Sequence, residues 1–110
     1  MDRLPPDLAE VVAELRKGLE ELYEERFRDL LLYGSFARGD AREGSDVDLL
    51  LLLDGPVNLG REITRTVDIS APLSLEHDIL LSVMPVNYDA YLRGETSFLR
   101  TVRQEAVRAA

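Results

Sequence analysis

The chain has no cysteine, a single lysine, a single histidine and no long apolar run, and these shortages exclude several classes of protein. Without cysteine there are no disulfides and no thiolate metal sites. The longest apolar run, 49–53, is far shorter than the ~20 residues that span a bilayer. The first six residues also lack the charged-then-apolar pattern of a signal peptide. We therefore expect a soluble cytoplasmic protein without membrane association.

Positive charge is scarce as well. The chain carries 13 Lys and Arg against 21 Asp and Glu, which gives a formal net charge of -8. Proteins that bind nucleic acid through its phosphates usually show a basic balance or a basic stripe, and neither is present here. The composition argues against direct nucleic-acid binding and favours a protein or a small molecule as the partner.

The length of 110 residues is near the commonest size for one domain, so we predict a single domain over 1–110. Residues 8–22 repeat apolar side chains at helical spacing, as do Leu59, Ile63 and Val67. In chain order we expect a helix over about 6–25, a strand over 30–33, a short helix over 36–38 capped by Ser35, and a strand over 46–53. A helix from about 59 that ends before Pro72 should follow, and then a strand over 77–84 closed by Pro85. The last elements should be a helical turn over 88–92 and a helix from about 95. This α-β-α-β-α-β-α order predicts an α/β fold, with helices packed on a small sheet.

The most informative motif joins Gly34-Ser35 to Asp46-Val47-Asp48 across ten residues. Glycine lets the backbone approach an anion closely, and a serine at the start of a short helix favours phosphate. Residues i and i+2 of a strand project from one face, so Asp46 and Asp48 should point together. Two adjacent carboxylates repel unless a cation lies between them, and Mg²⁺ takes oxygen ligands while sharing them with substrate phosphates. The motif indicates an enzyme that binds a nucleoside triphosphate.

A third carboxylate is needed if two metal ions are to activate a nucleophile and stabilise a leaving group. Asp78 is the best candidate, because it should open the third strand and align with Asp48 across the sheet. Glu76 and Asp68 are weaker candidates. Arg38 either binds a phosphate or bridges a nearby acidic residue, Asp40 or Glu43. Two further polar residues receive structural interpretations: His77 faces away from Asp78, and Ser45 forms a turn at the strand entry.

These residues resemble a known family. Gly34-Ser35 followed by Asp46-Val47-Asp48 is similar to the signature of the DNA polymerase beta nucleotidyltransferase superfamily, and the fuller form, 34–39 with 45–49, most resembles its minimal nucleotidyltransferase (MNT) branch. The resemblance implies a small mixed sheet flanked by helices and transfer of a nucleoside monophosphate, such as AMP from ATP, to an acceptor hydroxyl. It implies that Gly34, Ser35 and Arg38 bind the triphosphate. It also implies that Asp46, Asp48 and Asp78 hold two Mg²⁺ ions, with Asp78 helping to deprotonate the attacking oxygen.

Small members of this family often pair with a separately encoded HEPN-domain protein, a ribonuclease toxin. The resemblance therefore implies an antitoxin that adenylylates a tyrosine of its toxin within an oligomeric complex. Two alternatives stay open. One is a non-catalytic module that neutralises its partner by contact, and the other is a nucleotidyltransferase that acts on a small molecule.

Overall fold

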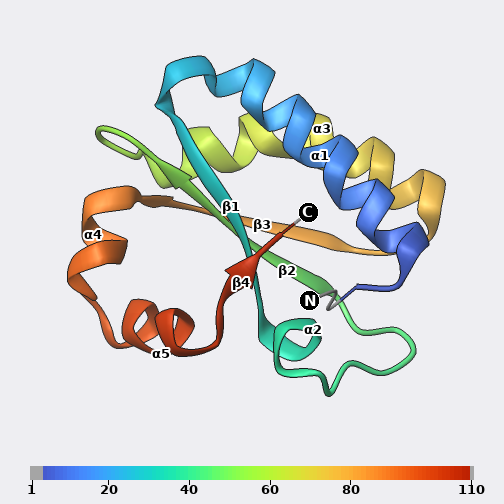
Figure 1. Cartoon of the computed structure of the whole chain (residues 1–110). Helices are drawn as coiled ribbons and strands as arrows, with labels where there is room; N and C mark the ends of the chain where they lie inside the picture. Colours follow the sequence, from blue (N-terminus) through green and yellow to red (C-terminus); the bar gives the residue numbers. More distant parts are fainter. Residues whose placement is uncertain (1–3, 110) are drawn as a thin grey trace.

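The computed structural model describes residues 4–109 as a four-stranded sheet between two helical layers (Figure 1). The strand order is β3-β2-β1-β4. The pairs β1–β2 and β1–β4 are antiparallel and β2–β3 is parallel, so the sheet is mixed, as the resemblance implied. Residues 1–3 and 110, at the ends of the predicted 1–110 domain, lie outside the described part. None of the helices in the described part is long and apolar enough to cross a membrane.

The elements follow the predicted order with two additions, a 3₁₀ turn and a short last strand. Their bounds are α1 Pro6–Tyr23, the 3₁₀ turn Glu24–Arg26, β1 Phe27–Tyr33, α2 Gly34–Arg38, β2 Val47–Leu53, α3 Leu59–His77, β3 Leu81–Asn87, α4 Tyr88–Arg93, α5 Ser97–Glu105 and β4 Val107–Arg108. The first helix, the short second helix and the helical turn at 88 are confirmed to within two residues. The last helix begins two residues later than expected, and strand β1 begins three residues earlier than expected.

The central strand β2 separates two apolar clusters, because alternate side chains of a strand point to opposite faces. Val47, Leu49, Leu51 and Leu53 join the larger cluster with α1, while Leu50 and Leu52 join a smaller cluster with Val102 of α5. Helices α1 and α3 cover the first face, and α4 and α5 lie on the second (Figure 1). Asp48 has the parity of Leu50 and therefore lies on the face covered by α5.

The prediction that the third helix ends before Pro72 is wrong. Helix α3 continues through Pro72 to His77. A proline inside a helix removes one hydrogen bond and costs about 3 kcal/mol, which packing of the following turn can offset. Leu73 is buried in the larger cluster, and Ser74 accepts hydrogen bonds from the N–H groups of Asp78 and Leu81 through its carbonyl and hydroxyl oxygens respectively. Ser74 thereby joins the end of α3 to the start of β3.

The third strand is also shifted from its predicted position. It runs from Leu81 to Asn87, so His77 and Asp78 precede it and Pro85 lies within it. Because β3 is an edge strand, Pro85 can lie where its missing N–H faces away from the neighbouring strand. A proline at this position is a common feature of sheet edges, where it discourages pairing with a further strand.

The apolar spacing that predicts α3 does not mark its buried face. Leu59, Ile63 and Val67 are 50%, 37% and 46% exposed. The buried positions of this helix are instead mostly polar: Glu62, Thr66, Ser70 and Leu73. An apolar stripe therefore runs along the outside of α3. We call Leu59, Ile63 and Val67 the α3 stripe.

Candidate active site

Gly34 and Asp48 meet where β1 and β2 pair. Tyr33, the last residue of β1, lies opposite Asp48 in the register, so the chain turns into α2 directly beside this carboxylate. Gly34 has φ +75°, a backbone conformation that other residues rarely adopt. A Cβ atom at residue 34 would collide with Oδ2 of Asp48. Two independent reasons therefore favour glycine at this position: its backbone conformation and the closeness of the Asp48 carboxylate.

Asp46 and Asp48 flank the buried Val47, although Asp46 lies one residue before the strand that it was predicted to open. Asp46 immediately precedes β2 and is exposed, whereas Asp48 lies in the strand and is half-buried. Burial is the main cause that raises the pKa of Asp48, and the charge of Asp46 adds to it. Within residues 4–109 neither carboxylate forms a hydrogen bond or an ion pair. The charge of Arg38 opposes the rise in the pKa of Asp48 only in part. Two adjacent oxygen-donor side chains that form no direct ion pair fit a hard divalent cation such as Mg²⁺.

Asp78 does not align with Asp48 across the sheet, and that part of the prediction is wrong. The residue of β3 opposite Asp48 is Ser82. Asp78 instead ends α3 in the left-handed conformation, with φ 51° and ψ 46°. Such a helix end is usually a glycine, although aspartate tolerates it, so the sequence gives little sign that the helix stops there.

Asp78 nevertheless lies on the same side of the molecule as Asp46. Both line a cavity of about 350 Å³, together with Gly44 and Ser74. In the part of the chain that the structure describes, no three Asp, Glu or His side chains converge on one point that could hold a metal ion. Asp78 thus shares this cavity with Asp46, whereas Asp48 is not one of its lining residues.

The weaker acidic candidates are on the outside of α3. Asp68 is exposed within the helix, as expected, and Glu76 is exposed near its end. The prediction that His77 lies in a strand is wrong, because it is the last residue of α3, where Nε2 is 4.0 Å from Oε2 of Glu76. Ser45 has the predicted turn role, since its hydroxyl accepts the N–H of Arg42 at 2.8 Å.

Ser35 and Arg38 both lie in α2, next to the carboxylate pair. Ser35 does not cap the helix as predicted: α2 begins at Gly34 with no side-chain cap. In the described residues its hydroxyl has no hydrogen-bond partner. Arg38 pairs with Asp40, Nε to Oδ2 at 3.3 Å, which is one of the two interpretations that the sequence left open. Its side chain remains 49% exposed and accessible to an anion.

Glu105 belongs to this site although sequence reasoning did not find it. Oε2 lies 3.0 Å from Nη1 of Arg38, and Oε1 accepts the N–H of Gly34 at 3.3 Å. Its charge also contributes to the raised pKa of Asp48. The available signal was its position in the last helix, one turn after the buried Val102. An acidic residue on that side of an amphipathic helix has to face another element.

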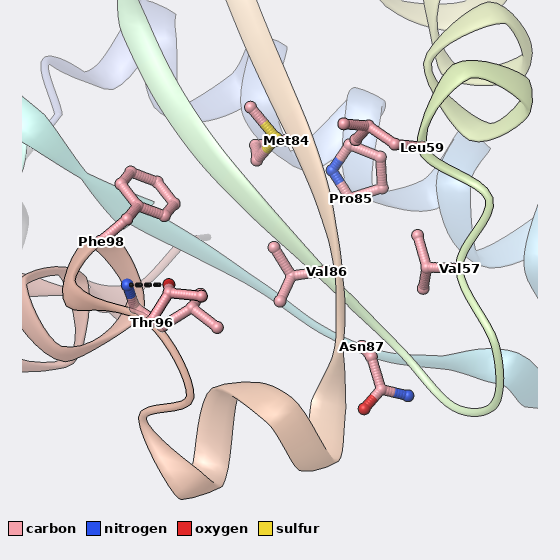
Figure 2. Close-up of a pocket in the computed structure, with 9 residues that line it drawn as sticks. Val57, Leu59, Met84, Pro85, Val86, Asn87, Thr96 and Phe98 are labelled. Carbon is pink, nitrogen blue, oxygen red and sulfur yellow. Dashed lines mark hydrogen bonds between the residues drawn. The ribbon is translucent and has the colours of Figure 1, made fainter.

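An open apolar groove lies along the edge strand β3, on the face of the sheet that α5 covers (Figure 2). Its volume is about 440 Å³. Val86 and Met84 line it from the edge strand and Phe98 from α5. Val57 lines it from the loop before α3, and Leu59 from the first position of α3. We call this feature the β3 groove. Leu59 belongs to both the groove and the α3 stripe, so the two apolar surfaces are continuous.

Comparison with known proteins identifies the family of the chain. A family model described as "Nucleotidyltransferase domain" matches residues 12–108, and the chain belongs to that family. The match includes the Gly34-Ser35 turn, the aspartate pair and Asp78. The resemblance inferred from the motif is thereby confirmed.

Two relatives come from Methanocaldococcus jannaschii. The first, "Putative protein adenylyltransferase MJ0141", is 33% identical over 101 residues, which are 92% of this chain and 97% of the relative. The second, "Putative protein adenylyltransferase MJ0604", is 26% identical over 95 residues, which are 86% of this chain and 89% of the relative. This chain is similar to both over nearly their whole lengths.

A solved structure shares the fold. It is described as "Crystal structure of the toxin-antitoxin with AMP-PNP", and one of its chains superposes with a TM-score of 0.56 at 17% identity. The superposition covers 93% of this chain and 72% of that chain. At this identity the likeness establishes the fold, which is the predicted α/β nucleotidyltransferase fold.

Proposed function

We propose that this chain is a cytoplasmic, Mg²⁺-dependent adenylyltransferase that transfers AMP from ATP to a hydroxyl group of a partner protein. One observation carries the proposal. Gly34, at the start of α2, lies so close to the carboxylate of Asp48, beside Asp46, that a side chain at residue 34 would collide with it. A phosphate-binding turn and a metal-binding pair are useful together only to an enzyme that handles a metal-bound phosphate. The names of the two relatives support the choice of a protein as the acceptor.

Asp46 and Asp48 are the residues that we assign to the metal, with Asp78 as a third carboxylate across the cavity. Bound Mg²⁺ would neutralise charge on the transferring phosphate and on the leaving group. Asp48 is held rigidly because it lies in a central strand, between Tyr33 on one neighbouring strand and Ser82 on the other. Asp46, before the strand, is exposed and can adjust to the ligand. The pair thus combines one fixed and one adaptable oxygen donor.

Gly34, Ser35 and Arg38 are assigned to the triphosphate. The Gly34 N–H and the Ser35 hydroxyl can donate to phosphate oxygens, and the Arg38 guanidinium can pair with them. In the transfer the acceptor oxygen forms a bond to the α-phosphorus, while the bond from that phosphorus to the bridging oxygen breaks. Pyrophosphate leaves with the electron pair. The proton of the acceptor hydroxyl passes to a carboxylate, and we assign this role to Asp78.

The β3 groove and the α3 stripe are the surfaces that we assign to the acceptor protein. Both are apolar and open, and small soluble domains seldom leave contiguous apolar surface without a partner. Strand β3 connects the groove to the site, because Ser82 is opposite Asp48 and the groove residues Met84 and Val86 follow on the same face. Pro85 disfavours the addition of another strand, so contact through side chains is the expected mode.

The resemblance of the motif points to a HEPN-domain toxin as the partner and to a tyrosine as its acceptor. Two observations support a protein complex of this kind. The fold neighbour is a toxin-antitoxin structure with AMP-PNP, an ATP analogue. The net charge of -8 also suits a basic partner that acts on RNA.

The test uses the purified chain with ATP labelled on its α-phosphate, Mg²⁺ and the product of the neighbouring gene. We expect label on the partner protein and an AMP adduct on a tyrosine in its mass spectrum. The matched control is Asp48→Asn, which should give no adduct. Labelling that is equal with Asp48→Asn, or absent with the unmodified chain, contradicts the proposal. Labelling of a small acceptor in place of the protein would point to the small-molecule alternative.

Neutralisation of the partner by contact is a second candidate function. It is favoured by the exposed α3 stripe and by the absence, in residues 4–109, of three converging metal ligands. The two functions differ in a simple rescue experiment in cells that express the toxic partner. Growth that Asp48→Asn still restores indicates contact alone, whereas growth that is lost with this variant indicates transfer.

A further inference from the structure

A carboxylate of the protein itself, that of Glu105, already contacts two of the groups that we assign to the triphosphate. The two oxygens of Glu105 interact separately with Gly34 and Arg38, at 3.3 Å and 3.0 Å. The geometry matches the way in which a phosphate would use a backbone N–H and a guanidinium at the same time. The protein itself thus shows that this corner of the site accepts a bidentate anion.

The Glu105 carboxylate pairs with Arg38 and at the same time adds negative charge to an already acidic site. Burial is the main cause that raises the pKa of the Tyr33 hydroxyl, and the charges of Asp48 and Glu105 add to it, so Glu105 lies close to this part of the site. A neutral acceptor such as glutamine would satisfy the Gly34 N–H without this charge. The negative charge of Glu105 is matched by Arg38, the same guanidinium that we assign to a phosphate.

The Glu105 side chain can leave without unfolding the chain. It is 19% exposed, so solvent reaches it. The backbone around it is fixed on both sides: Leu99 and Val102 bury α5, and the next element, β4, pairs with β1. Release thus needs rotation of one side chain and no movement of the helix.

We propose that Glu105 is a built-in competitor of the nucleotide, whose carboxylate occupies the triphosphate-binding corner and has to be displaced when ATP binds. The inference rests on the proposed function only in taking Gly34 and Arg38 as phosphate ligands. It assigns to the end of α5 a regulatory role at the same site. Apparent affinity for the nucleotide is lowered by the free energy of the contacts that Glu105 makes.

The test measures binding rather than transfer. Isothermal titration gives the Kd of a non-hydrolysable ATP analogue and of inorganic triphosphate for the wild type and for Glu105→Gln. We expect Glu105→Gln to bind both ligands roughly tenfold more tightly, because a charge-assisted contact no longer competes with them. Glu105→Ala, which removes the contact completely, should show a gain at least as large. Circular dichroism establishes that each variant is folded.

Two further variants serve as controls. Glu95→Gln removes the same charge from a residue that pairs with Arg93 away from the site, and its Kd should equal that of the wild type. In an Arg38→Gln background the gain from Glu105→Gln should shrink, since one of the two contested groups is missing. A gain that is undiminished in this background contradicts direct competition.

Other results overturn the inference. Equal affinity of the wild type and Glu105→Gln means that the carboxylate does not compete. Weaker binding by Glu105→Gln means that Glu105 positions Arg38 for the nucleotide, and absence of binding by every variant means that the corner is no phosphate site. Failure of this inference is distinguishable from failure of the proposed function, because the comparison of Kd values needs only ATP binding and no transfer of AMP.

Discussion

The carboxylate of Glu105 accepts a hydrogen bond from the backbone N–H of Gly34, although 71 positions separate the two residues along the chain. The contact brings the end of the last long helix into the turn that carries the sequence motif. It also places a second acidic side chain, besides Asp46, near Asp48, whose pKa is raised by burial, by Asp46 and by Glu105. The predictions below follow from this concentration of negative charge and from the surfaces around it.

Asp48→Asn should abolish Mg²⁺ binding and AMP transfer while stabilising the metal-free protein. The raised pKa means that ionised Asp48 is disfavoured in the folded state, so the folded protein loses stability as the pH rises through that pKa. The melting temperature of Asp48→Asn without metal should exceed that of the wild type at neutral pH, and the difference should vanish in acid. Asp68→Asn, on the exposed side of α3, is the matched control and should change neither property. A lower melting temperature for Asp48→Asn would contradict this account.

Gly34→Ala and Gly39→Ala form a matched pair. Both glycines have positive φ, +75° and +82°, so each substitution should cost about 1–2 kcal/mol through backbone strain. Only at residue 34 would the new Cβ collide with Asp48, since nothing lies within 4 Å of a Cβ at residue 39. We expect nucleotide binding to be lost in Gly34→Ala and kept in Gly39→Ala, as measured by titration calorimetry. Equal binding by the two variants would exclude the tight approach as a requirement.

Asp78→Asn tests the carboxylate across the cavity from Asp46. Asparagine tolerates the left-handed conformation at the end of α3, so the melting temperature should change little. Because asparagine cannot accept the proton of the acceptor hydroxyl, activity should fall by roughly 100–10,000-fold, the range typical of a general base. The measurement is the rate of label transfer at saturating ATP. A rate equal to that of the wild type would remove Asp78 from the site.

Tyr23→Phe should destabilise the protein without affecting the active site. The Tyr23 hydroxyl donates to Oε1 of Glu62 at 3.0 Å, and Glu62 is only 2% exposed. Its loss would leave a buried carboxylate with Arg65 alone, at 3.4 Å, and should lower the free energy of unfolding by about 1–3 kcal/mol. Urea denaturation measures this change. Tyr88→Phe, which removes the same atom elsewhere, is the control and should have a smaller effect.

The same tyrosine predicts a loss of stability in alkali. Burial, followed by the hydrogen bond to Glu62 and its charge, raises the pKa of Tyr23 to about 12. An unfolded tyrosine ionises near pH 10, so between about pH 10 and 12 the unfolded chain releases a proton that the folded chain retains. Stability of the wild type should fall over this range. Tyr23→Phe should lack this part of the decrease, and an unchanged alkaline transition in the variant would contradict the assignment.

Leu59→Asp and Leu92→Asp test the surface for the acceptor protein. The two leucines are similarly exposed, 50% and 48%, but only Leu59 lies in the β3 groove. A charge at residue 59 should weaken binding of the acceptor protein at least tenfold, because a desolvated charge in an apolar contact is unfavourable. ATP binding should be unchanged in both variants. Equal binding of the acceptor by both variants would place its contact surface elsewhere.

The local parts of the fold could be predicted from the chain because they depend on near neighbours. The apolar spacing of Val11, Val12, Leu15 and Leu19 is sufficient for α1, and all four are buried. The alternation of β2 similarly predicts that Asp48 projects away from Val47. Predictions failed where local rules compete with packing: a proline did not end α3, and the α3 stripe faces outward while Glu62 is buried.

The sequence alone was sufficient to predict that the Gly34-Ser35 turn lies beside the Asp46-Asp48 pair, because both depend on spacing within one or two neighbouring elements. Only the tertiary structure decided which other groups join them. Asp78 moved from the expected strand to the end of α3, since packing of Leu73 and the contacts of Ser74 extend the helix past Pro72. Glu105 entered the site because α5 packs beside α2, a long-range contact that no local pattern specifies.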